Sequence, residues 1–182
     1  MAGPWLVPVT SFRRSTGAVL PVVREGRLEP LRVADTTAGG DDPVIADVTL
    51  TSADGGIDVA GTVVTRWHGA CRRCLRPVEG RLEVPVREVY SPAAPRRGAD
   101  DEETYKLGTD HLDLEPLVRD AVLLALPLAP LCREDCAGLC PSCGADLSDG
   151  PCGCPTVAGD PRWAALDVLR LDPGGAPAPG RD

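Results

Sequence analysis

The chain has 182 residues, of which 43% are hydrophobic and only 3% aromatic, so a core must be built mainly from aliphatic side chains. Its 19 Lys and Arg against 27 Asp and Glu give a formal net charge of −8, which excludes a uniformly basic nucleic-acid binder. No apolar run is long enough to span a bilayer, and the N-terminus lacks the basic and apolar stretches of a secretory signal, so we expect a soluble, cytoplasmic protein.

The first 90 residues predict β-strands. Residues 1–33 alternate short apolar runs around a basic turn at 13–17, which predicts two short strands, and 36–43 predicts a loop. The next strand is 44–51, with Val44, Ala46, Val48 and Leu50 on one face, and Asp54-Gly-Gly predicts a hairpin turn into a second arm at 57–67. A third arm, 78–90, follows Cys71 and Cys74. The pattern predicts an antiparallel meander whose tip carries two thiols.

A helix is predicted after an acidic loop. Residues 91–108 are Pro-rich and then acidic, which favours a flexible loop. Residues 113–126 predict a core helix, with Asp113 or Glu115 as its cap and Pro116 in its first turn. Its apolar stripe would pack on the sheet and comprises Leu114, Leu117, Val118, Ala121, Leu124 and Ala125. We therefore expect an α+β domain over 1–131, a zinc-binding lobe with a short helix (161–171) over 132–172, and a disordered tail over 173–182.

Eight cysteines carry the strongest chemical signal. Six lie within 131–154, and Cys140-Pro-Ser-Cys143-Gly resembles the metal-holding knuckle of zinc ribbons, in which a glycine such as Gly144 permits the turn. The spacing predicts two Zn²⁺ sites of four thiolates each: Cys140, Cys143, Cys152 and Cys154 in one, and Cys71, Cys74, Cys132 and Cys136 in the other. In the alternative, one site uses four of the six late cysteines and leaves Cys71 and Cys74 as free thiols.

Other roles for the cysteines and histidines are less favoured. Disulfides suit the even count, but the missing secretory signal argues against an oxidising compartment. A redox role for Cys71 and Cys74 would need a thiol at a helix start, whereas the pattern there predicts a hairpin turn. Neither His68 nor His111 precedes the glutamate that zinc deaminases need, and neither has an evident metal or triad partner. The sequence also lacks the nucleotide-binding and hydrolase motifs. The sequence thus favours a protein that is not an enzyme and has no small-molecule substrate.

Charge is unevenly distributed along the chain. Residues 66–81 carry a net charge of +4 around the first cysteine pair, whereas 100–120 carry −6. Local basic surfaces on an acidic protein can bind phosphates, so Arg72, Arg73 and Arg76 are candidate RNA contacts, on the basis of charge and position alone. A solvated arginine hairpin without a ligand is the alternative interpretation.

Three motifs follow one another along the chain. They are C-x-R-C-L at Cys71, Arg73, Cys74 and Leu75, the helical segment 113–127, and the cysteine run 132–154 followed by Asp-Pro-Arg at 160–162. Together they resemble the YceD family of large ribosomal RNA subunit accumulation proteins. The resemblance spans roughly residues 10–172 in order. The sequence departs slightly in Leu147-Ser-Asp-Gly, where an Asn usually follows the Leu. The resemblance implies a role in accumulation or processing of 23S rRNA through binding that RNA or its precursor, and offers no catalytic residues.

Two hypotheses result. In the first, a zinc-stabilised biogenesis factor binds 23S rRNA or its precursor through the basic hairpin tip. Aromatic residues for base stacking are few, so recognition would rely on the phosphate backbone and the shape of the RNA. In the second, a zinc-held module docks a basic large-subunit ribosomal protein or assembly factor through the acidic loop. The first predicts salt-sensitive RNA affinity that weakens when the three arginines are replaced. The second predicts negligible RNA binding and loss of partner capture when residues 100–103 are deleted.

Overall fold

The computed structural model describes residues 3–92, 105–155 and 162, and it is mostly antiparallel sheet with a single α-helix among those residues, as the α+β expectation required. The strands of the large sheet are β2 (Val19–Gly26), β3 (Leu31–Val33), β4 (Thr36–Ala38), β5 (Val44–Ala53), β6 (Gly56–Ala70), β7 (Pro77–Ser91) and β8 (Tyr105–Lys106). A small second sheet pairs β1 (Leu6–Pro8) with β9 (His111–Asp113). The helices are the 3₁₀ turn η1 (Phe12–Arg14) and α1 (Glu115–Ala125).

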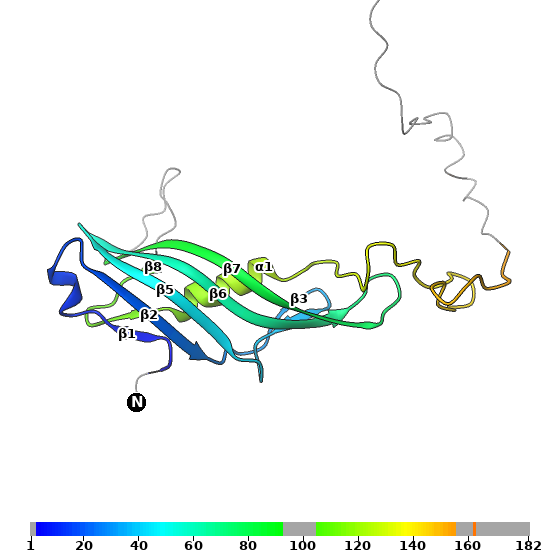
Figure 1. Ribbon diagram of the computed structural model, residues 1–182, viewed down its shortest axis with the longest axis horizontal. Helices are drawn as coiled ribbons and strands as arrows, with labels where there is room; N and C mark the ends of the chain where they lie inside the picture. Colours follow the sequence, from blue (N-terminus) through cyan, green and yellow to red (C-terminus); the bar gives the residue numbers. More distant parts are fainter. Residues whose placement is uncertain (1–2, 93–104, 156–161, 163–182) are drawn as a thin grey trace, which may run out of the picture.

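The meander predicted by alternation is present, and it places the hairpin tip at one end of the molecule. Val44, Ala46, Val48 and Leu50 are all buried, and the turn at Gly55 leads from β5 into β6. β6 and β7 stay paired from Ile57–Tyr90 to Ala70–Pro77, so this long hairpin continues beyond α1 (Figure 1). Residues 71–76, which we call the hairpin tip, therefore project from the end of a two-stranded arm formed by β6 and β7.

One face of the sheet is covered by α1 and by the β1–β9 pair. Leu117, Val118 and Val122 of α1 are fully or almost fully buried in the same core as the inward residues of β5 and β6. Tyr90 of β7 is also in this core, where its hydroxyl donates to the carbonyl oxygen of Asp113 at 2.9 Å and its ring stacks on Tyr105. The core is aliphatic apart from such positions, as the composition required. In the described part of the chain, no helix is both long and apolar enough to cross a membrane.

Several local expectations were wrong. The first 33 residues contain three strands rather than two, and β4 occupies part of the predicted loop 36–43 because β6 extends past β5 and needs a partner for Trp67 and His68. β8 pairs in parallel with the end of β7 within the expected flexible loop. In α1, Leu124 is 88% exposed, whereas Val122, which the expected stripe omitted, is buried.

The start of α1 also differs from the expectation, although Asp113 contributes. Leu114 holds the N-cap position without a side-chain bond, but Asp113 Oδ1 accepts the backbone N–H of Glu115 at 3.0 Å, and Pro116 lies in the first turn as expected. Most of the predicted acidic loop, all of the short helix at 161–171 except Arg162, and the tail at 173–182 lie outside the described residues, and the proposed domain division stays a prediction.

Candidate metal centre

Two distant segments meet at the hairpin tip. Inside the tip, the backbone N–H of Cys71 donates to the carbonyl oxygen of Arg76 at 2.8 Å. The chain leaving α1 runs back along the arm, where the Thr36 hydroxyl donates to the carbonyl oxygen of Pro127 at 3.0 Å and the backbone N–H of Arg72 donates to that of Pro130 at 2.9 Å. These bonds bring Cys132 and Cys136 to the tip. We call residues 71–76 together with 131–154 the thiol head.

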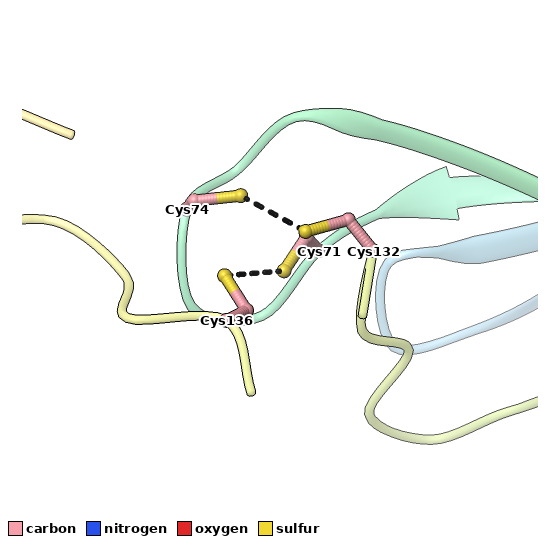
Figure 2. Close-up of side chains that lie close together, drawn as sticks. All are labelled: Cys71, Cys74, Cys132 and Cys136. Carbon is pink, nitrogen blue, oxygen red and sulfur yellow. Dashed lines mark hydrogen bonds between the residues drawn. The ribbon is translucent and has the colours of Figure 1, made fainter. Parts of the chain in front are cut away.

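The first cluster consists of Cys71, Cys74, Cys132 and Cys136, whose sulfur atoms all lie within 4.8 Å of one another. Figure 2 shows the four side chains turned toward a common centre, with Sγ–Sγ distances of 3.8 Å for Cys71–Cys136 and 3.6 Å for Cys74–Cys132. All four are free thiols, and three are buried. Four sulfurs at about 2.3 Å from a tetrahedral Zn²⁺ ion lie about 3.8 Å apart. The arrangement therefore fits a tetrahedral metal ion and does not contain a disulfide.

The second cluster consists of Cys140, Cys143, Cys152 and Cys154, again with all sulfurs within 4.8 Å. The backbone N–H of Ser142 lies 3.4 Å from Cys140 Sγ, and Gly144 adopts a φ of +74° while donating its N–H to the carbonyl oxygen of Cys140. These are the contacts expected of a zinc knuckle. The sulfur atoms thus lie in the two groups of four that the spacing predicted, with Cys71 and Cys74 next to Cys132 and Cys136.

The hairpin tip forms the same knuckle turn with a different residue. Leu75 donates its N–H to the carbonyl oxygen of Cys71 at 2.8 Å and has a φ of +61°, so it takes the place that Gly144 has in the second knuckle. A left-handed conformation costs a residue with a side chain roughly 1–2 kcal/mol. The surrounding tip must offset that cost. A metal ion bound to Cys71 and Cys74 would do so by fixing both ends of the turn.

The acidities of the thiols show why each cluster suits a cation. Hydrogen bonding from the backbone N–H of Cys74 lowers the pKa of Cys71 to about 6, and that of Cys143 lowers the pKa of Cys140 to about 6. Burial raises the pKa of Cys132 to about 12, and the hydrogen bond with the Cys143 side chain raises the pKa of Cys154 to about 12. Neighbouring thiols thus oppose complete ionisation of a cluster. A bound divalent cation would remove that opposition.

The three candidate RNA-binding arginines have different environments. Arg73 Nη1 donates to the carbonyl oxygens of Glu134 at 3.2 Å and Cys136 at 2.9 Å. Arg76 Nη2 lies 2.6 Å from Asp146 Oδ2 and 3.4 Å from Asp149 Oδ1. The side chain of Arg72 is exposed and has no hydrogen bond or ion pair with the described residues. Two of the three arginines therefore hold the thiol head together, and Arg72 is available to a ligand.

The basic character of the tip is largely cancelled in three dimensions. Residues 131–154 carry a net charge of −3, which lies against the +4 of residues 66–81. A Zn²⁺ ion held by four thiolates adds about −2 at each cluster. Sequence counting missed this effect because the neutralising acids come from a distant segment; Asp146, for example, is 70 residues from Arg76. The metal-loaded thiol head would be acidic overall.

Arg66 and Arg81, which the sequence pattern did not single out, lie directly opposite each other on β6 and β7. Both side chains are exposed, and their ion pairs with Glu79 and Glu83 are long, at 3.6 and 3.7 Å. They border a hollow of about 460 Å³ on the outer face of the sheet, next to Ile45 and Val64. Like charges placed opposite each other disfavour the sheet, so this pair is a candidate anion contact.

His68 has more partners than expected. Its Nε2 lies 2.8 Å from Asp42 Oδ2, and its Nδ1 lies 3.5 Å from Glu79 Oε2. The sequence predicted no metal or triad partner for this histidine, and it did not indicate these two carboxylates, which the pairing of β6 with β4 and β7 brings to it. His68 is therefore held between two acidic side chains at the surface of the sheet.

Comparison with known proteins identifies the family. The sequence profile described as Large ribosomal RNA subunit accumulation protein YceD matches residues 59–170. An uncharacterized protein of Mycobacterium tuberculosis is 35% identical over 170 residues, covering 91% of this chain and 81% of the relative. An uncharacterized protein of Mycobacterium leprae is 37% identical over 133 residues, covering 71% of this chain and 61% of the relative.

A more distant relative has a descriptive name. The large ribosomal RNA subunit accumulation protein YCED homolog 1, chloroplastic, of Zea mays is 25% identical over 135 residues, covering 58% of this chain and 46% of the relative. No solved structure matches this chain. The profile match covers more than half of the chain and includes all eight clustered cysteines. The chain therefore belongs to the YceD family of large ribosomal RNA subunit accumulation proteins.

Proposed function

We propose that this protein is a zinc-stabilised, non-enzymatic, cytoplasmic factor that supports accumulation or processing of 23S rRNA by binding that RNA or its precursor. Family membership supports the link to large-subunit rRNA. The observation that carries the structural part is the pair of four-thiol clusters at the end of the β6–β7 arm. They make the thiol head a rigid, projecting surface, and a surface of this kind suits recognition rather than chemistry.

Zinc is the metal that the donor set favours. Four thiolates in a tetrahedral arrangement select Zn²⁺ or iron, and a site whose four positions are all protein ligands is structural, because no position remains for water or substrate. Metal analysis of protein purified without chelator should give two zinc ions per chain. Iron in place of zinc would contradict the choice of metal, and no metal at all would contradict the metal centre itself.

The RNA contacts that the geometry favours are Arg72 at the hairpin tip and the pair Arg66 and Arg81 on the arm. Arg73 and Arg76 remain candidates by charge, but their hydrogen bonds within the thiol head compete with phosphate binding. The ion pairs of Arg66 and Arg81 are exposed and contribute little to stability, so these side chains can exchange carboxylate for phosphate at small cost. Backbone phosphates are the chemical group that such arginines would bind.

The test is a salt titration of RNA binding with matched triple variants. Replacing Arg66, Arg72 and Arg81 with Gln should weaken binding to a 23S rRNA precursor fragment and reduce the slope of log K against log salt by about 2, at about 0.7 per phosphate contact for single-stranded RNA. The control variant replaces Arg14, Arg24 and Arg87, which belong neither to the hairpin tip nor to the Arg66–Arg81 pair, and it removes the same charge. Equal losses in both variants would show only nonspecific attraction, and undetectable binding of the wild type would refute direct RNA contact.

The acidic charge of the metal-loaded thiol head favours a second function, docking of a basic large-subunit ribosomal protein. Glu134, Asp135 and Asp149 are acidic residues of its surface. If this function is correct, replacing these three residues with their amides should weaken capture of a purified basic ribosomal protein, while the arginine variant captures it normally. Unchanged capture by the amide variant would refute this second function.

A further inference from the structure

The second cysteine cluster is attached to the first through two of the three arginines of the hairpin tip, Arg73 and Arg76. Arg73 reaches across to the carbonyl oxygens of Glu134 and Cys136, and its own carbonyl oxygen accepts the backbone N–H of Leu139 at 3.1 Å. Leu139 directly precedes Cys140, the first thiol of the second cluster. The backbone that enters the second cluster is therefore hydrogen-bonded to the knuckle of the first.

Arg76 makes the connection on the other side of the second knuckle. Its guanidinium lies 2.6 Å from Asp146, and Asp146 lies between Cys143 and Cys152. The Asp146 side chain is only 16% exposed, and its other oxygen accepts the backbone N–H of Ser148 at 2.8 Å. This carboxylate thus orients the loop that leads from the second knuckle to the closing cysteines, and the guanidinium orients the carboxylate.

The chain between these contacts is tightly fitted. Leu139 forms an isolated antiparallel bridge with Asp146, and the backbone N–H of Leu147 donates to the carbonyl oxygen of Gly138. Gly138 has a φ of +79°, and a Cβ atom added there would lie 3.1 Å from the Arg73 carbonyl oxygen. A side chain at this position would meet both a strained backbone conformation and a tight contact, so glycine favours this close approach of the two knuckles.

The two clusters differ in what else supports them. The first is built on the end of the β6–β7 arm and on the segment leaving α1, both of which are fixed by the large sheet. The second is formed by residues 140–154, whose regular structure is limited to the isolated bridge of Asp146 with Leu139. Among the described residues, its ion pairs to the rest of the protein come from Arg76, and the backbone N–H of Leu147 donates to the carbonyl oxygen of Gly138, next to Leu139, whose own N–H donates to the carbonyl oxygen of Arg73.

We propose that Arg76, through Asp146, is a positioning residue that couples the two metal sites, so that metal in the first cluster organises the second and raises its affinity. The proposal rests on the metal binding proposed above, but not on RNA binding. A metal ion between Cys71 and Cys74 fixes the turn that ends at Arg76, and Arg76 then holds Asp146 where the second knuckle needs it. Because coupling between two binding sites is reciprocal, metal in the second cluster raises the affinity of the first by the same factor.

The experiment titrates the reduced, metal-free full chain with Zn²⁺ in competition with a chromophoric chelator and determines both dissociation constants. In Arg76→Gln, the weaker site should lose about tenfold in affinity, within the roughly 5- to 150-fold range typical of coupled sites. Asp146→Asn should produce the same loss, and the double variant should lose no more than either single one. The control, Arg133→Gln, removes an arginine of the same thiol head that pairs with its neighbour Asp135 and should leave both constants unchanged.

A second background distinguishes coupling from local damage. In the Cys140→Ser, Cys143→Ser protein, which retains only the first site, Arg76→Gln should not change zinc affinity, because the partner site no longer exists. Weakening of the first site in that background would overturn the proposal and make Arg76 a part of the first knuckle alone. The proposal would also be overturned if the wild type bound two zinc ions and the Arg76→Gln variant bound them with the same two dissociation constants. Failure of the wild type to bind any metal would instead refute the metal centre itself.

Discussion

Removing the metal from the first cluster should destabilise the whole sheet, because this cluster joins segments far apart in sequence. Cys74 and Cys132 are 58 residues apart, and Cys71 and Cys136 are 65 residues apart. A cross-link that closes a loop of this length lowers the entropy of the unfolded chain by an amount equivalent to about 4 kcal/mol at 25 °C. With a urea dependence of about 2 kcal/mol per M, the Cys71→Ser, Cys74→Ser variant should unfold at a urea concentration about 2 M lower than the wild type.

The measurements are zinc content per chain and urea unfolding followed by circular dichroism, each with and without chelator. The double variant should bind one zinc ion per chain. Chelator should lower the urea midpoint of the wild type to that of the variant, and this comparison separates the loss of metal from the effect of serine at two buried positions. The control, Cys143→Ser with Cys154→Ser, disables a cluster confined to 140–154 and should lower the urea midpoint by no more than about 0.7 M, because a tenfold loss of coupling is about 1.4 kcal/mol. A variant that retained two zinc ions, or unfolded at the wild-type midpoint, would refute the cross-link.

Two further predictions concern the core that positions the arm. Tyr90→Phe should lower the free energy of unfolding by about 1–2 kcal/mol, because the carbonyl oxygen of Asp113 loses its hydrogen bond. Burial raises the pKa of Tyr90 in the folded state above the ordinary tyrosine pKa of about 10. The stabilisation is therefore complete below about pH 10 and is lost as the pH rises further, because the unfolded chain ionises first. Urea midpoints between about pH 9 and 11 should fall more steeply for the wild type than for Tyr90→Phe, and equal slopes would contradict this prediction. Gly61→Ala should lower the free energy of unfolding by about 3 kcal/mol, because the new Cβ would approach the Asp47 carbonyl oxygen far inside contact distance. The control Gly3→Ala, with open space around it, should change the free energy of unfolding little. Similar urea midpoints for both variants would contradict the close packing of β6 against β5.

Local patterns predicted the parts of the fold that one segment determines by itself. Alternation placed Val44, Ala46, Val48 and Leu50 on the buried face, and two glycines marked the turn into β6. The cysteine partition was also predictable, since 140–154 contains four closely spaced thiols and leaves only one remaining group of four. In each case the evidence lies within a short stretch of residues.

The rest depended on partners that the sequence pattern does not identify. β4 forms because β6 extends beyond the end of β5 and pairs there with residues 37 and 38. This depends on the relative lengths of β5 and β6, which the residues 36–43 do not indicate by themselves. Val122 and Leu124 are two residues apart and so lie on nearly opposite sides of α1, and packing against β7 and the core buries Val122 rather than Leu124. Arg73 and Arg76 can be recognised as basic from the sequence. Their partners in 134–149 are distant in sequence and lie next to them only in the folded thiol head.

Charge neutralisation at the thiol head also affects how this surface would recognise RNA. A count of charges along 66–81 suggests a strongly basic tip, yet folding brings acids to it and metal binding by eight thiolates would add further negative charge. Long-range attraction to RNA would therefore be weak, and binding would rely on a few arginines held at fixed positions. Metal would then have two opposed effects, because it fixes the positions of these arginines while it makes their surroundings more acidic. An RNA affinity that rises on metal loading, despite the added negative charge, would show that positioning outweighs electrostatic attraction.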